Sequence, residues 1–327
     1  MKNLIESFPE QLKEAIDIGE KATFTKPKHK IQNIVITGLG GSGIGGTIVQ
    51  QLTQDKIEVP ISVNKGYFLP NFVNEHTLLI VSSYSGNTEE TLMAFDAGLK
   101  ANAKIACVTS GGMVKAYAEQ HDLDFIQIPG GNPPRACLGY SLTQLFYILK
   151  GYDLIDASFQ KDLVEAVALI IDEKESIHKE AKDIANKLHN KIPIIYSADN
   201  FEGISIRFRQ QVNENSKMLC WHHALPEMNH NELVGWKDKN DDIAVIFFRT
   251  DEDFVRTQRR MEISKEIISK YTSNIYEVHS KGNSTIERSI YLINLGDWIS
   301  WYLSELHGVD ATEVNVIDFL KGSLAKD

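Results

Sequence analysis

The segment Ser83–Thr91 gathers short hydroxyl side chains around a glycine, between an apolar run and a helix-like stretch. Its hydroxyl residues are Ser83, Ser85, Thr88 and Thr91. The free N–H groups and the positive dipole end of a helix N-terminus, together with such hydroxyls, can hold a phosphate without a lysine. One of these residues could simply cap the helix, but capping would explain one hydroxyl and not all of them. We therefore predict a phosphate cradle on Ser83, Ser85 and Thr88.

A second motif, Gly38-Leu-Gly-Gly-Ser-Gly43, fits the dinucleotide pattern G-x-G-x-x-G after a strand and before a helix. Dinucleotide binding also needs an acidic residue at the end of the next strand, where this chain has Asn64-Lys65-Gly66. No Gly-Lys-Ser/Thr follows, which excludes a Walker A loop. The remaining interpretation is a turn at Gly40 and Gly41 that lets a substrate approach the backbone, with Ser42 as a hydroxyl donor to phosphate. The alternative is a tight turn without a ligand.

Two charged residues could take part in a reaction, one as a base and one as a stabiliser of negative charge. Glu214 lies between two asparagines, beyond the helical Arg207–Gln211 stretch, and a carboxylate there could act as a base if its surroundings raise its pKa. The alternative is a solvated glutamate on a helix. Arg135 follows two prolines at the start of a helix expected over residues 135–150, where a cation is locally unfavourable. Its guanidinium could stabilise a developing oxyanion.

Three histidines, His222, His223 and His230, lie near Cys220 and Glu227 and raise the question of a metal site. Adjacent histidines project in different directions, and no pair has the i, i+4 spacing of helical zinc ligands. We therefore predict no metal and no cofactor. Because imidazole titrates near neutral pH, a histidine of this segment could instead act as a proton shuttle.

Short apolar runs alternate with amphipathic stretches from residue 30 onward, which indicates βαβ units and a parallel sheet. The expected strands of the first half are Ile34–Ile36, Val59–Val63, Leu78–Val81, Lys104–Thr109 and Phe125–Ile128. Both motifs follow strands, at the edge where open α/β sheets bind ligands. An amphipathic helix is expected over residues 1–22.

The second half repeats this pattern without visible sequence similarity to the first. Strands are expected at Ile192–Tyr196, Asp242–Phe248 and Asn274–His279, and helices at Arg256–Lys270 and Ile286–His307. A long stretch, 160–190, with balanced charges is expected to be a solvated helix between the halves. We place the boundary there, giving domains 1–153 and 154–327. No second glycine-rich turn follows Ile192–Ser197, so a duplicated second half would lack the phosphate loop.

Length and composition agree with two globular domains, since 327 residues correspond to two units of roughly 150 each. The 34 Lys+Arg against 44 Asp+Glu give a net charge of −10, which disfavours nucleic acid and anionic membrane surfaces as partners. Three widely spaced cysteines encode neither a disulfide framework nor a zinc ribbon. We find no signal peptide pattern and no apolar run of about 18 residues, so a cytoplasmic location is predicted.

The two motifs together resemble the sugar isomerase (SIS) domain, a doubly wound α/β fold that binds phosphosugars. Further segments resemble, in the same order, signatures of the bifunctional phosphoglucose/phosphomannose isomerases across nearly the whole chain: Pro133–Arg135, Asn213–Lys217, Pro226–Glu232 and Phe319–Lys321. The resemblance implies two SIS domains in tandem and a homodimer whose active site is shared between subunits. The chain departs from the family pattern at Asp310–Glu313, where a proline-richer turn is expected, and this bears on the position of Lys321.

The resemblance also implies roles for the candidate residues. Glu214 would move a proton between C2 and C1 of a hexose 6-phosphate, Arg135 would stabilise the enediolate, and His230 with Lys321 would open the sugar ring. The expected reaction interconverts glucose 6-phosphate, and mannose 6-phosphate, with fructose 6-phosphate. The alternatives are a non-catalytic phosphosugar sensor, which needs the cradle but no acid–base set, and an isomerase or deaminase acting on amino sugars.

Overall fold

The computed structural model describes residues 1–324 and 326 as an alternation of helices and strands. The elements up to residue 173 are α1 (Lys2–Glu6), α2 (Phe8–Glu20), β1 (Asn33–Thr37), α3 (Gly40–Thr53), β2 (Ile61–Asn64), β3 (Thr77–Ser82), α4 (Glu89–Lys100), β4 (Lys104–Thr109), α5 (Gly112–Gln120), β5 (Asp124–Gln127), the 3-10 helix η1 (Pro134–Ala136), α6 (Leu138–Gly151) and α7 (Ser158–Asp172). The later elements are α8 (Lys174–Leu188), β6 (Ile192–Ala198), η2 (Asp199–Phe201), α9 (Glu202–Ser216), β7 (Trp221–Leu225), η3 (Glu227–His230), η4 (Glu232–Gly235), β8 (Ile243–Arg249), α10 (Val255–Ile268), β9 (Ile275–His279), α11 (Thr285–His307) and α12 (Asn315–Leu324).

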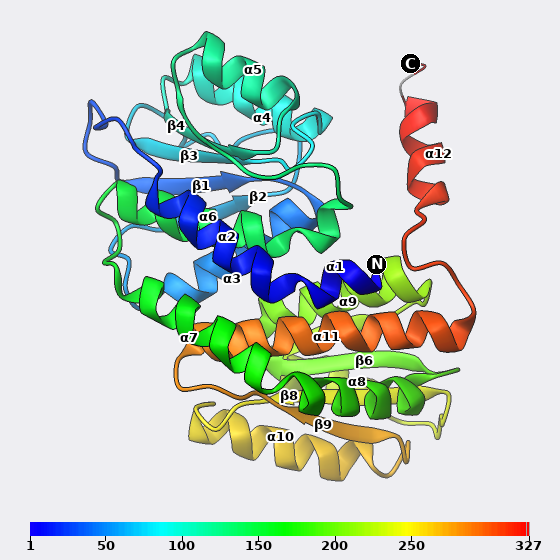
Figure 1. The fold of residues 1–327 in the computed structure, drawn as a ribbon. Helices are drawn as coiled ribbons and strands as arrows, with labels where there is room; N and C mark the ends of the chain where they lie inside the picture. The colour runs from blue at the N-terminus through cyan, green and yellow to red at the C-terminus, as the bar shows by residue number, and fades with distance from the viewer. Residues whose placement is uncertain (325, 327) are drawn as a thin grey trace. The chain divides into compact units, whose positions relative to one another are not determined.

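The chain divides into two compact units (Figure 1). The N-terminal unit comprises Glu6–Glu173 and Lys281–Tyr291; the C-terminal unit comprises Met1–Ile5, Lys174–Ser280 and the described residues from Leu292 onward. Residues 154–173, which include α7, thus fall in the N-terminal unit, whereas the expected boundary followed Asp153.

The N-terminal unit is built on a parallel sheet with strand order β2-β1-β3-β4-β5. Successive side chains of a strand point to opposite faces, and β1 illustrates this: Val35 packs in the cluster with Phe95 of α4 and Val114 of α5. Its neighbour Ile36 instead contacts α3 at Gly46. All six residues of β3 are buried, as expected for a central strand covered on both faces. The predicted α/β class with a parallel, doubly wound sheet is confirmed for this unit.

The C-terminal unit contains a second parallel sheet, of order β7-β6-β8-β9. Met261 and Ile268 of α10 pack with Tyr196, Val245 and Phe247 on one face of the sheet. Figure 1 shows α9 and α11 on the other side of β6. The strand order resembles that of the first sheet with one strand fewer, so the parallel architecture predicted for both halves is confirmed.

Several local predictions were wrong. The single helix expected over residues 160–190 is two helices, α7 and α8, which end and begin around Glu173. Neither is merely solvated, because each buries an apolar face, with Leu163 in α7 and Ile184 in α8 as examples. The expected N-terminal helix is likewise divided at Ser7 into α1 and α2. The strand β7 was not anticipated.

No helix among residues 1–324 and 326 combines the length and apolar character needed to cross a membrane.

Candidate functional site: the N-terminal unit

The glycine-rich motif lies between β1 and α3 and forms the first turns of that helix, which begins at Gly40. Gly40 has a φ of +53°, a left-handed conformation that favours glycine. A Cβ on Gly38 would lie 2.5 Å from the Ser82 carbonyl oxygen, and one on Gly41 would lie 3.0 Å from that of Pro134. The tight-turn interpretation therefore accounts for Gly38 and Gly41, whereas at Gly40 only the backbone conformation requires glycine.

Ser42 connects the two motifs. Its side chain is buried, and its hydroxyl oxygen accepts a hydrogen bond from the backbone N–H of Tyr84 at 3.1 Å. A serine hydroxyl that accepts one bond can still donate its own proton. The structure thus brings Ser42 against the start of the hydroxyl segment, as phosphate binding by both motifs requires.

The hydroxyl segment turns from β3 into α4. Ser83 is buried and donates to the Thr88 hydroxyl at 3.4 Å, while Ser85 is exposed and accepts from the Asn87 N–H at 3.3 Å. Thr88 is the N-cap residue of α4, yet its side chain makes no capping hydrogen bond. The first-turn N–H groups of α4 are therefore not capped by Thr88, and such groups are the donors that a bound anion can use.

Two further residues fix the shape of this turn. Gly86 has a φ of +70°, and a Cβ there would lie 1.9 Å from the Gly111 carbonyl oxygen, so only glycine fits. Thr91 is fully buried, and its hydroxyl has no hydrogen-bond partner among the described residues. Of the hydroxyl residues in the motif, Thr91 thus lies inside the fold, while Ser85 reaches solvent.

Tyr84 is the residue of this region that sequence reasoning missed. Besides the bond to Ser42, its carbonyl oxygen accepts from the backbone N–H and the hydroxyl of Ser110. Its phenol oxygen accepts from the N–H of Asn132 at 3.2 Å. Burial raises the pKa of Tyr84, so the phenol stays neutral. An aromatic residue between hydroxyl residues was the available signal, and Tyr84 links the motif to the loop that leads to Arg135.

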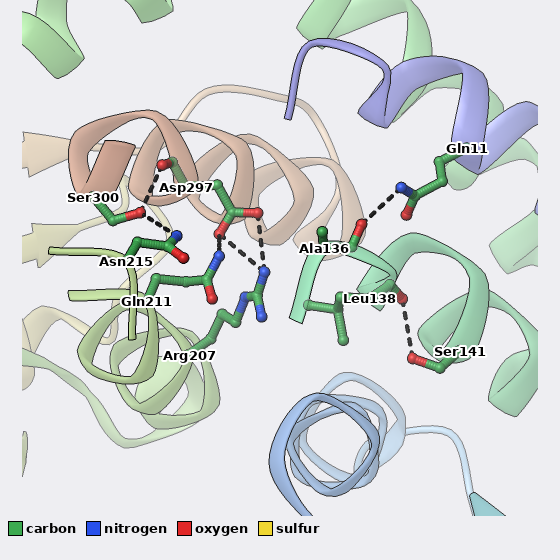
Figure 2. A network of polar contacts seen from close by, with 9 residues as sticks. All are labelled: Gln11, Ala136, Leu138, Ser141, Arg207, Gln211, Asn215, Asp297 and Ser300. Carbon is green, nitrogen blue, oxygen red and sulfur yellow. Dashed lines mark hydrogen bonds and ion pairs between the residues drawn. The ribbon is translucent and has the colours of Figure 1, made fainter. Parts of the chain in front are cut away.

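Arg135 lies in η1, the short helix before α6, and not in α6 itself, which begins at Leu138. Its side chain is buried. The backbone of this turn is held by Gln11, whose amide donates to the Ala136 carbonyl at 2.7 Å (Figure 2). A Cβ added to Gly41 would lie 3.5 Å from the Cα of Arg135. The structure therefore places the arginine backbone beside the glycine turn, in the same unit as Ser42 and the hydroxyl segment.

Candidate functional site: the C-terminal unit

Glu214 lies in the last turn of α9, not beyond the helix as predicted. An acidic residue there faces the negative end of the helix dipole, which is unfavourable for stability alone. With the apolar residues Met218, Leu219, Val314, Val316 and Ile317, among others, it lines a groove of about 350 Å³ between the end of α9 and the start of α12. The half-buried carboxylate of Glu214 thus lies beside apolar side chains of this groove.

The helix that carries Glu214 is fixed to α11 by a polar network (Figure 2). Arg207 contacts both carboxylate oxygens of Asp297, at 3.1 and 3.0 Å, and Gln211 donates to the same carboxylate at 2.8 Å. Burial raises the pKa of Asp297, while Arg207 and Gln211 oppose that shift. One turn further, Asn215 donates to the Ser300 hydroxyl at 2.9 Å. These bonds fix Gln211 and Asn215, which lie on either side of Glu214 along α9.

Lys217 organises the segment between α11 and α12. It ends α9 in the left-handed conformation, with a φ of +57°. Its ammonium group donates to the carbonyl oxygens of Glu214, Asp310 and Glu313, each within 2.9 Å. Polar bonds from Lys217 thus order the segment 310–313 in which the chain lacks the expected prolines.

His230 and Lys321 are both exposed. His230 ends η3 in the loop after β7, and Lys321 lies on α12, beyond the residues that line the groove of Glu214. The structure places neither side chain in that groove. The apolar residues Val316, Phe319 and Leu320 of α12 are exposed as well, at 82%, 77% and 57%.

The remaining histidines occupy β7, where adjacent side chains point to opposite faces of the sheet. His222 lies 3.7 Å from the carboxylate of Glu202, and His223 lies 2.8 Å from that of Glu232. Within residues 1–324 and 326, no group of three or more His, Cys, Asp or Glu side chains is arranged to hold a metal ion.

Similar proteins were found by sequence and by structure. Residues 177–324 match the family described as bacterial phospho-glucose isomerase C-terminal SIS domain. The solved C-terminal domain of glucosamine-fructose-6-phosphate aminotransferase from Francisella tularensis is similar with a TM-score of 0.76 and 15% identity, covering 95% of this chain and 97% of that one. The fold is that of the sugar isomerase (SIS) class.

Curated relatives define the family more closely. The bifunctional phosphoglucose/phosphomannose isomerase of Caldicellulosiruptor bescii is 39% identical, over 98% of this chain and 97% of that protein. The protein of the same name from Aquifex aeolicus is 35% identical, over 90% and 91%. The chain therefore belongs to the bifunctional phosphoglucose/phosphomannose isomerase family, and the resemblance inferred from its motifs is confirmed.

Proposed function

We propose that this protein is a phosphosugar isomerase that interconverts glucose 6-phosphate and mannose 6-phosphate with fructose 6-phosphate through a cis-enediol. The observation that carries the proposal is the start of α4. There, the Thr88 side chain makes no capping bond, the Ser83 hydroxyl lies 3.4 Å from that of Thr88, and Ser85 is exposed in the turn between them. A helix N-terminus built in this way binds anions. Family membership makes a hexose 6-phosphate the anion to test.

In this proposal, residues of the N-terminal unit bind the substrate. Ser42 would donate to the phosphate with the hydroxyl segment, and Gly40 and Gly41 would let the sugar approach the backbone. Arg135 would stabilise the negative charge that develops on the enediolate oxygen. Its charge suits this role, because donors aimed at developing charge stabilise a transition state most effectively in a site shielded from water.

The C-terminal unit supplies the proton chemistry. Glu214 would remove the proton from C2 and return it to C1, a task for which a carboxylate in partly apolar surroundings is suited. The same base can serve both C2 epimers if the C2–C3 bond rotates in the enediol. His230 and Lys321 would open the sugar ring by moving the ring-oxygen proton. No metal or cofactor enters these steps.

The activity test is a coupled assay of purified protein with glucose 6-phosphate, mannose 6-phosphate and glucosamine 6-phosphate. We expect fructose 6-phosphate from the first two substrates. Binding of these sugars without turnover would indicate a phosphosugar sensor, and exclusive turnover of the amino sugar would indicate an amino-sugar isomerase or deaminase. Either result would overturn the proposal.

We further propose that the protein is a cytoplasmic homodimer with an active site shared between subunits. Two findings support this: the exposure of His230, and the apolar residues presented to solvent by α12. Apolar patches of this kind mark interaction surfaces.

Mixing two inactive variants, Glu214→Gln and His230→Ala, tests the shared site. If His230 acts in the partner's site, one site of each mixed dimer keeps both residues, and random mixing restores roughly one quarter of the wild-type activity. A mixture that remains inactive after subunit exchange, or a monomeric protein in sedimentation experiments, would contradict the shared site.

A further inference from the structure

The loop that follows β7 has little regular structure of its own. It consists of the short 3-10 helices η3 and η4, joined at Asn231. Such helices have poor hydrogen-bond geometry and rarely exceed one turn. The position of this loop must therefore depend on its side chains.

Two asparagines anchor the first part of the loop. Asn229 donates to the hydroxyl of Ser264 on α10 at 2.9 Å and accepts from Arg260 on the same helix at 3.3 Å. Asn231 donates to Glu227 and accepts from the N–H of Glu232, each at 2.6 Å. The histidine between them, His230, is exposed, and its imidazole makes no hydrogen bond or ion pair with the described residues.

Glu232 anchors the second part of the loop to the sheet. Its carboxylate accepts a hydrogen bond from the Tyr196 hydroxyl at 2.5 Å and lies 2.8 Å from Nδ1 of His223. The Tyr196 oxygen in turn accepts from the indole N–H of Trp236 at 3.2 Å, beyond the other end of η4. Tyr196 is fully buried in β6 and pairs with His223 in the parallel register. Glu232 thus ties the loop to two neighbouring strands.

The phenol of Tyr196 is a permanent donor to this carboxylate. Burial raises the pKa of Tyr196, and the hydrogen bond to Glu232 raises it further. A short bond from a buried donor to a carboxylate is among the stronger hydrogen bonds of proteins. A rigid strand on one side and a charged acceptor on the other make a clamp with little freedom.

We infer that Glu232 and Tyr196 are positioning residues that hold the loop so that His230 projects from it in one orientation. The inference rests on the proposed function of His230 in ring opening. Misplacement of a reacting group by about 1 Å can cost 10²-fold in rate. The clamp would therefore act on kcat through His230, without touching the phosphate cradle of the N-terminal unit.

The test compares Tyr196→Phe, Glu232→Ala and Glu232→Gln with the wild type. We expect the first two to lower kcat by about 10- to 100-fold while KM for glucose 6-phosphate stays near the wild-type value. Glu232→Gln keeps an acceptor for the Tyr196 hydroxyl and should recover most of the loss. Tyr276→Phe is the matched control, because this tyrosine donates only a 3.3 Å bond to Asn274 near its own strand.

Hydrogen exchange gives a second readout that does not depend on activity. Peptides covering residues 226–236 should exchange faster in Tyr196→Phe and Glu232→Ala, but not in Tyr276→Phe. Unchanged exchange in this segment would overturn the clamp. Faster exchange with an unchanged kcat would overturn the link to His230. If the wild-type protein does not isomerise hexose phosphates, the proposed function fails, and exchange alone decides whether the clamp exists.

Discussion

The candidate residues of the N-terminal unit are held differently from those of the C-terminal unit. Ser42, Ser83 and Arg135 are buried at 5%, 2% and 4% exposure, on turns that glycines and backbone hydrogen bonds fix in place. His230 and Lys321 are exposed, and Glu214 is only half-buried. A phosphate keeps its charge throughout the reaction, so the residues that bind it can be held in position before the substrate binds. Groups that exchange protons need an environment shielded from solvent. A single chain does not provide this environment around His230 or Lys321.

The units also differ in their buried carboxylates. Burial raises the pKa of Asp124 in the N-terminal unit, but hydrogen bonds from Lys104, Tyr152 and Thr25 outweigh this and leave it below the usual value. In the C-terminal unit, burial dominates and raises the pKa of Asp297 despite its arginine partner. Charge is thus stabilised at Asp124, at the start of β5, and penalised at Asp297, which binds the helix that carries Glu214.

The largest effect that this comparison predicts is at Glu214. Glu214→Gln keeps shape and hydrogen bonding but removes the base, so both isomerisations should fall together by ~10²–10⁴-fold. The measurements are the two rates and the uptake of solvent deuterium at C2. Glu313→Gln, which changes another carboxylate lining the same groove, is the control. Near-wild-type activity on either epimer would show that Glu214 is not the shared base.

A smaller effect is expected at the phosphate cradle. Thr88→Val removes a hydroxyl that makes no capping bond, so α4 should remain intact while KM for hexose 6-phosphates rises. The expected loss is on the order of 1.5–3 kcal/mol, the value of a hydrogen bond to a charged group. Steady-state kinetics check it, and Thr47→Val is the control because that hydroxyl is buried with no hydrogen-bond partner among residues 1–324 and 326. An unchanged KM would argue against Thr88 as a phosphate ligand.

A third prediction concerns the charged anchor of the N-terminal unit. Asp124 forms an ion pair with Lys104 at 2.8 Å and accepts from Tyr152 at 2.5 Å. Because its folded-state pKa is lowered, its stabilisation is present above the unfolded carboxyl value of about 3.9 and is lost as pH falls through the folded-state pKa. Asp124→Asn should cost about 1–3 kcal/mol at neutral pH.

Urea unfolding at several pH values checks this prediction. The stability difference between wild type and Asp124→Asn should shrink as the pH falls below about 4. Asp122→Asn is the control, since Asp122 is exposed and its φ of +52° suits asparagine. A difference that does not change with pH would mean that the charge of Asp124 contributes nothing.

The first sheet could be predicted from sequence because its strands are short apolar runs between polar helices, and Lys104–Thr109 matches β4 to the residue. The strand β7 was missed because its sequence, Trp-His-His-Ala-Leu, carries two histidines and suggested metal ligands. The extension of α9 to Ser216 depends on bonds from Asn215 and Ser216 to Ser300, a contact between distant segments that no local pattern encodes. For the same reason, the roles of Tyr84 and Glu232 emerged only with the structure.

The smallest expected effect is none, because dialysis against a strong chelator should leave both isomerisations unchanged. The adjacent histidines that raised the question of a metal site lie in the strand β7. His222 and His223 therefore point to opposite faces of the sheet and cannot both bind one ion. Nδ1 of His223 is already paired with Glu232, whose other oxygen binds Tyr196. The proposed chemistry needs a carboxylate base and cationic or imidazole acids, all of which are side chains. Rates before and after dialysis, and after addition of zinc, test this expectation. Activity that is lost and then restored by zinc would show that the histidines of this region bind a metal, and would move the proton chemistry away from Glu214.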